Sequence, residues 1–173
     1  LLLLRVNQVE HAARNVRFGD NAASFDFEPG NGGVIIEFNR GSVRNLRVVH
    51  ERNLQAFADG AVFNPDWLAR VGDAEQFRFM DWMLTNNSET RTWDQRARVA
   101  DYSWARRGVP LEIMIQLAKD TGAEPWFTLP HLADDDYVAQ FALMVHDGLR
   151  PGLRGWFEFS NEIWNWSFAQ ADW

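Results

Sequence analysis

A Ser-Asn-Glu triplet follows a short apolar run in the stretch FEFSNEIWNW, residues 157–166. A strand that ends in an amide and a carboxylate is a poor way to close a core, but it presents a proton donor well in a cleft. A carboxylic acid placed in this way can give a proton to a reacting group or take one from it. Glu162 is therefore the candidate catalytic residue of this chain.

Two earlier strand-like runs also end in polar residues. FRFMDW brings Arg78 and Trp82, and PWFTLPH brings His131. If the strands are parallel, their carboxyl ends lie at one edge of the sheet, together with Asn161 and Glu162. Considered alone, Arg78 could instead form a structural ion pair. His131 could instead be a hydrogen-bonded residue that only packs. Their occurrence in successive units favours a shared site.

The elements that would hold these residues alternate between strand and helix from about residue 64 onward. Strand-like runs occur at 45–49, 77–80, 125–130 and 155–159. Helix signals are Asn64-Pro65 before WLARV, the apolar spacing of LEIMIQLAKDTG closed by Gly122, and Asp134–Asp136 before YVAQFALMVHDGL. Such alternation indicates right-handed βαβ units and a parallel sheet. No glycine-rich phosphate loop is present, so the first half of a (β/α)8 TIM barrel is the preferred α/β fold.

Residues 1–44 have a different sequence pattern. FDF and VIIEF flank the cluster EPGNGG, which predicts a β-hairpin. We expect residues 1–44 to be a β-rich segment, the end of a β-sandwich-like domain, and residues 45–173 to be the truncated barrel. The ends of the chain look cut, because there is no initiator Met and SFAQADW resembles a helix that has just begun.

Composition excludes several classes of function. A net charge of −7 offers no basic stripe for nucleic acid. The chain has no cysteine, which excludes disulfides and thiolate metal sites, and LLLL at residues 1–4 is too short to span a membrane. The run Asp134–Asp136 suits a helix start better than a metal site. We expect no metal, cofactor, nucleic-acid or membrane partner. Among nine tryptophans and thirteen phenylalanines, most would fill the core and a minority could stack on sugar rings.

The order of arginine, histidine and Asn-Glu on three successive strands resembles clan A of the glycoside hydrolases, which are (β/α)8 enzymes that include cellulases and mannanases. The likeness covers residues 45–173. WFEFSNEIWN is similar to the fourth-strand signature of the clan, with Glu158 four residues before Glu162. The clan usually has Pro after Asn-Glu, where this chain has Ile163. The stretch also resembles bacterial barrel proteins with SNE and WNW motifs and a β-rich N-terminal region.

The resemblance implies a retaining hydrolase of a β-linked polysaccharide or oligosaccharide, with Glu162 as general acid/base and an extracellular or cell-surface location. It implies that Asn161 binds the 2-hydroxyl of the sugar, that Arg78 orients the nucleophile, and that His131 contacts substrate or Arg78. The nucleophile would follow the seventh strand, outside this chain. Burial among Trp164 and Trp166 would help Glu162 to hold its proton. Those two tryptophans and Trp82 are also candidate sugar-binding residues.

Other interpretations remain open at this point. Glu162 could simply cap the helix that follows it. The chain could belong to a barrel that binds carbohydrate or has a structural role without catalysis, or to an unrelated α/β enzyme. Glu158 lies about 13 Å down the strand from Glu162 at ~3.3 Å per residue, whereas a retaining pair needs roughly 5–5.5 Å. We expect Glu158 to face the barrel interior, paired with Arg78.

Overall fold

The computed structural model describes residues 14–27 and 46–173. The chain divides into two compact units, Leu1–Val49 and His50–Trp173. In the first unit, β1 (Arg14–Phe18) pairs antiparallel with β2 (Ala23–Asp26). The hairpin predicted between FDF and VIIEF depends on residues 28–45, which lie outside the described residues, as do residues 1–13.

The strand predicted at residues 45–49 is wrong for the part of it that is described. Residues 46–49 have no regular secondary structure. Leu46 and Val48 are 48% and 68% exposed. An apolar run becomes a strand through cross-strand packing and burial of one face, and these two side chains gain neither.

The second unit begins with the short helices η1 (Glu51–Asn53), α1 (Leu54–Ala58) and α2 (Pro65–Val71). The predicted start of α2 is confirmed. Asn64 caps it by accepting a hydrogen bond from the backbone N–H of Asp66 at 2.9 Å, and Pro65 occupies the first turn, where no N–H is needed.

A parallel sheet follows, formed by β3 (Gln76–Arg78), β4 (Glu124–Leu129) and β5 (Trp156–Phe159). Its strand order is β3-β4-β5, as the sequence predicts, and Trp126 is in register with both Arg78 and Trp156. Within the described residues this is a three-stranded α/β sheet that does not close into a barrel.

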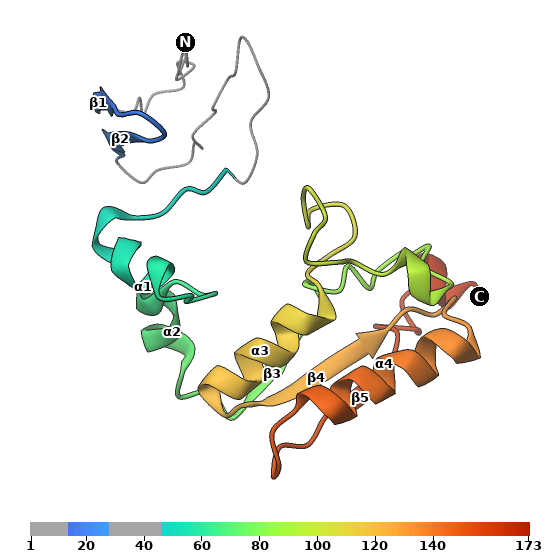
Figure 1. Ribbon diagram of the computed structural model, residues 1–173. Helices are drawn as coiled ribbons and strands as arrows, with labels where there is room; N and C mark the ends of the chain where they lie inside the picture. Colours follow the sequence, from blue (N-terminus) through green and yellow to red (C-terminus); the bar gives the residue numbers. More distant parts are fainter. Residues whose placement is uncertain (1–13, 28–45) are drawn as a thin grey trace. The chain divides into compact units, whose positions relative to one another are not determined.

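Helices α3 (Leu111–Thr121) and α4 (Asp135–Gly148) lie against one face of this sheet (Figure 1). Both predicted ends are confirmed. Gly122 closes α3 at φ 81°, a conformation that favours glycine, and Asp134 caps α4 by accepting from the N–H of Tyr137 at 2.7 Å. The predicted metal alternative for the Asp134–Asp136 run is unnecessary, because the run begins a helix.

The core lies between the helices and the sheet and is largely aromatic. Phe127, at the centre of β4, has no exposed surface and packs edge-on against Phe141 of α4. The other buried members of the cluster are Phe79, Leu111, Met114, Ile115, Leu117, Tyr137 and Val145. Since side chains alternate along a strand, residues of the opposite parity point to the face that the helices leave open.

Two 3-10 turns complete the second unit. Turn η2 (Trp93–Gln95) lies in the long segment between β3 and α3, and η3 (Ala169–Ala171) is the short helix that SFAQADW predicted. No helix in the described part of the chain is long and apolar enough to cross a membrane.

Candidate functional site

Arg78 and Glu158 form the base of the candidate site on the open face of the sheet. The Nε of Arg78 donates to Oε2 of Glu158 at 3.1 Å, and its Nη2 donates to Oε1 at 3.0 Å and to Oε2 at 2.8 Å. The guanidinium also lies over the ring of Trp126, 5.2 Å from its centre. This two-pronged ion pair, which reaches across β4 from β3 to β5, confirms the predicted pairing of Glu158 with Arg78.

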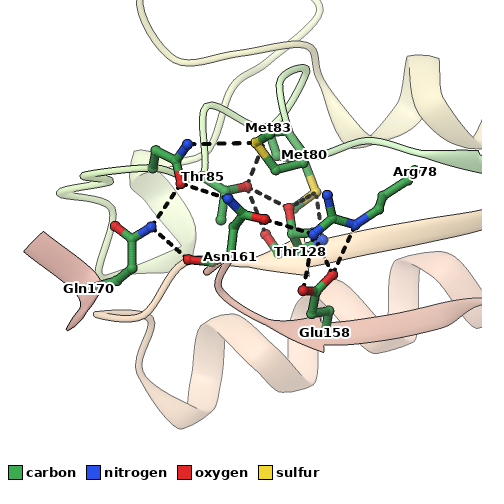
Figure 2. A network of polar contacts seen from close by, with 9 residues as sticks. Arg78, Met80, Met83, Thr85, Thr128, Glu158, Asn161 and Gln170 are labelled. Carbon is green, nitrogen blue, oxygen red and sulfur yellow. Dashed lines mark hydrogen bonds and ion pairs between the residues drawn. The ribbon is translucent and has the colours of Figure 1, made fainter. Parts of the chain in front are cut away.

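Asn161 is joined directly to this pair. Its Oδ1 accepts from Nη2 of Arg78 at 2.8 Å, and its Nδ2 donates to Oδ1 of Asn86 at 2.9 Å (Figure 2). Only 3% of the residue is exposed. The amide therefore has a fixed orientation, with one hydrogen bond accepted at Oδ1 and one donated from Nδ2. The predicted meeting of Arg78 and Asn161 at the carboxyl edge of the sheet is confirmed.

Gln170 supports Asn161 from the other side. Its Nε2 donates to Oδ1 of Asn86 at 2.8 Å and to the backbone oxygen of Asn161 at 2.7 Å, and its Oε1 accepts from the N–H of Asn87 at 3.0 Å. Gln170 is 3% exposed. Sequence reasoning missed Asn86 and Gln170, because no spacing in the chain links them to the Ser-Asn-Glu triplet.

The segment after β3 is tied to the sheet at two further points. The hydroxyl oxygen of Thr85 is buried and lies 3.2 Å from the backbone oxygens of both Met80 and Thr128, so its one hydrogen can bond to either. At the far end of the segment, Gly108 has φ 86°, and a Cβ there would lie 2.4 Å from the backbone oxygen of Trp82. The segment therefore needs glycine at that position to return to the start of α3.

The turn that carries Asn161 has an unusual backbone. Ser160 and Glu162 have φ 55° and 44°, in the left-handed region that L residues other than glycine rarely occupy. Each such residue costs roughly 1–2 kcal/mol. The backbone bond from Ser160 N–H to the oxygen of Leu129, at 2.8 Å, helps to hold this strained turn at the end of β5. Backbone strain of this kind is common at functional sites.

Glu162 is half-buried, and its Oε2 accepts from Nδ2 of Asn165 at 2.8 Å. No hydrogen bond among the described residues occupies its Oε1. Since a carboxyl group needs one oxygen for its proton, this arrangement leaves Oε1 available to exchange a proton with a ligand.

The expected burial of Glu162 among two tryptophans is wrong. Trp164 and Trp166 are 71% and 76% exposed. They lie on the irregular segment after β5, where no described element covers them. Both indoles remain open to solvent, as a stacking surface for sugar requires. Trp82, the third candidate, instead contacts the core, with ring centres 5.4 Å from Phe79 and 6.1 Å from Trp67.

His131 directly follows β4 and does not make the predicted contact with Arg78. It is 4% exposed, its ring centre lies 6.2 Å from that of Trp173, and its Nδ1 has no partner among the described residues. None of the hydrogen bonds in the described part of the chain joins it to Arg78. Burial lowers the pKa of His131, and the positive charge of Arg91 lowers it further.

His131 makes the second unit sensitive to acid. The imidazole titrates near about pH 6.5 in the unfolded chain, so below that pH the unfolded state binds more protons than the folded one. We expect the free energy of unfolding to be intact above about pH 6.5 and to fall as the pH drops below it. In urea titrations at several pH values, His131→Phe should reduce this fall. An identical pH dependence in His131→Phe and the parent would contradict this origin.

The described residues contain no group of three His, Cys, Asp or Glu side chains placed to hold a metal ion. No family model, curated protein or solved structure matches this chain. The site is therefore defined by its own geometry. It has a buried asparagine held by an arginine, a half-buried glutamate on a strained turn beside it, and two exposed indoles just beyond.

Proposed function

We propose that the chain is the N-terminal half of a (β/α)8 glycoside hydrolase that resembles clan A and retains configuration at the anomeric carbon. Its substrate would be a β-linked polysaccharide or oligosaccharide, met outside the cell or at its surface. Glu162 would be the general acid/base, and the nucleophile would come from the second half of the barrel, beyond this chain. No cofactor is required for this reaction.

The contact between Arg78 and Asn161 carries the proposal. It joins the end of β3 to the turn after β5, and thereby fixes the residue directly before Glu162 at the carboxyl edge of a parallel sheet. Ligands of α/β barrels bind at this edge. The ion pair of Arg78 with Glu158 holds the guanidinium in place, so that the amide of Asn161 cannot rotate without losing a charge-assisted hydrogen bond.

The steps follow from general glycoside chemistry. Glu162 gives its proton to the glycosidic oxygen as the bond from that oxygen to the anomeric carbon breaks and the missing carboxylate attacks. Glu162 then removes a proton from the water that releases the sugar. Asn161 would bind the 2-hydroxyl beside the reacting carbon. Trp164 and Trp166 would offer aromatic faces to neighbouring sugar rings.

A second candidate is a barrel that binds carbohydrate without cleaving it. Glu158, the carboxylate within β5, is bound at both oxygens by Arg78 and is not free to attack an anomeric carbon. The chain would then provide the exposed indoles and Asn161 for recognition alone.

A hydrolysis assay separates these candidates. A longer protein that contains this chain and the second half of the barrel is expected to release reducing ends from at least one β-glycan, and the 173-residue chain alone should release none. Binding of a glycan by the longer protein without release of reducing ends would favour the second candidate. Turnover by the 173-residue chain alone would overturn the division of the site between two halves.

A further inference from the structure

The segment between β3 and α3 is strongly basic in an acidic chain. Residues 91–107 contain five arginines and two aspartates, whereas the whole chain has a net charge of −7. The backbone N–H of Asp134 donates to the oxygen of Arg91 at 2.8 Å, which places the start of this segment beside the loop after β4. The start of this basic segment thus lies beside the carboxyl end of β4.

Part of this segment lines a hollow, which we call the Arg96 hollow. Its polar lining comes from Thr90, Arg96, Arg107 and Tyr137. The remaining lining is largely apolar and consists of Met83, Trp93, Ala97, Val109, Leu111, Met114, Pro130 and Phe141. Since Pro130 directly follows β4, the hollow lies at the carboxyl edge of the sheet. Two arginines on one small hollow, with no carboxylate in its lining, attract an anion.

Arg96 is held in place but is incompletely paired. Its guanidinium stacks on Trp93, 4.5 Å from the ring centre, and its Nη2 lies 3.3 Å from Oε1 of Glu112. Its Nε is buried and has no hydrogen-bond partner among the described residues. Oε2 of Glu112 is buried without a partner as well, so this ion pair leaves one donor and one acceptor unsatisfied. A buried donor without a partner costs about 1–3 kcal/mol.

Arg107 and Tyr137 supply further donors. Arg107 is exposed and makes no ion pair within 4.0 Å in residues 14–27 and 46–173. Tyr137 is 5% exposed, and its hydroxyl takes part in none of the hydrogen bonds of that part of the chain. Burial raises the pKa of Tyr137 to about 12, which keeps the hydroxyl protonated and able to donate.

The free space of the hollow is about 30 Å³, roughly the room of two water molecules. The two oxygens of a carboxylate need similar space. We propose that the Arg96 hollow binds the carboxylate of an acidic sugar, so that the substrate is a β-glycan containing uronic acid. This inference rests on the proposed function, and it adds the charge class of the glycan.

A carboxylate suits these donors better than a neutral hydroxyl or a sulfate. The planar guanidinium fork matches the two oxygens of a carboxylate in one plane. A neutral sugar hydroxyl brings no charge to the two arginines. A sulfate is tetrahedral and bulkier, and does not match a planar fork with all its oxygens.

The test compares two neighbouring arginines. Arg107 lines the hollow, whereas Arg106 is also exposed but does not line it. Arg107→Gln and Arg106→Gln make the same change in charge on the surface, so neither should prevent folding. Binding of a β-linked oligouronate to the 173-residue chain would be followed by tryptophan fluorescence, with a neutral β-linked oligomer and a sulfated one of equal length as comparisons.

We expect the oligouronate to bind more tightly than the neutral or sulfated oligomer. Arg107→Gln should weaken its binding about tenfold, as the loss of a charged hydrogen bond predicts, and Arg106→Gln less than about twofold. Raising the salt from about 0.02 M to about 0.5 M should weaken the binding severalfold. Equal losses in the two variants, or equal affinity for the acidic and neutral oligomers, would overturn the proposal, as would tighter binding of the sulfated oligomer.

These outcomes are separate from those of the proposed function. If the longer protein hydrolysed neutral glycans with no preference for uronate, the proposed hydrolase activity would stand and the proposed acidic substrate would be wrong. Oligouronate binding that depends on Arg107, without hydrolysis by the longer protein, would keep the anion site and favour the non-catalytic barrel.

Discussion

Replacing Glu162 by Gln in the longer protein is expected to lower the turnover of a natural β-glycan by about 10²–10⁴-fold, the usual contribution of a general acid. The amide keeps the size of the side chain and can still contact Asn165, but it has no acidic proton to give to the leaving oxygen. Because the substrate contacts remain, KM should change far less than kcat. Steady-state kinetics with the parent and the variant measure both quantities.

Glu75 provides a matched control for this substitution. It is exposed and directly precedes β3, at the opposite end of the strand from the site. Glu75→Gln removes the same charge and should leave kcat within about twofold, since exposed charges far from a site contribute little. If Glu162→Gln were as active as Glu75→Gln on natural glycan, Glu162 would have no part in the reaction.

The largest expected effect on stability comes from Phe127. Its side chain has no exposed surface and packs against Phe79, Phe141 and Phe157. Removing the ring leaves a cavity between β4 and α4, and we expect Phe127→Ala to lower the free energy of unfolding by about 3–5 kcal/mol. Urea unfolding followed by tryptophan fluorescence measures this change. A domain of this size is stable by about 5–15 kcal/mol, so the variant should be close to unfolding.

Phe57→Ala is the control for that loss. Phe57 lies in α1 and is 43% exposed, so the same deletion removes less buried area and should cost no more than about 1.5 kcal/mol. Comparable losses in the two variants would show that the packing around Phe127 is not the core of the second unit.

Much of the second unit could be predicted because its signals are local. Asn64-Pro65, Gly122 and Asp134 each act on backbone groups within a few residues, and all three mark the helix ends where the sequence places them. The strand predicted at 45–49 was wrong because a strand depends on contacts with residues far away in the sequence. A strand needs a partner, and its apolar composition says nothing about whether one is present.

The site could be predicted from the sequence only where strand geometry fixes the direction in which a side chain points. Alternation along β5 places Glu158 on the open face, and parallel pairing then brings it to Arg78. Asn86 and Gln170 are joined to each other across 84 residues, which no pattern in the chain indicates. Glu162 was expected to be buried among the tryptophans that follow it, but the irregular segment that carries Trp164 and Trp166 leaves both exposed.

The most direct test of Glu162 as the proton donor is the dependence of the Glu162→Gln variant on the leaving group. A natural glycan has a poor leaving group, which needs the proton from Glu162. An activated aryl glycoside has a good leaving group, which departs with little protonation. The first step, followed as a burst of released aryl alcohol, should therefore keep much of its rate in the variant, while hydrolysis of the natural glycan is nearly lost. An equal loss of rate on both substrates would contradict the assignment of Glu162 as the acid.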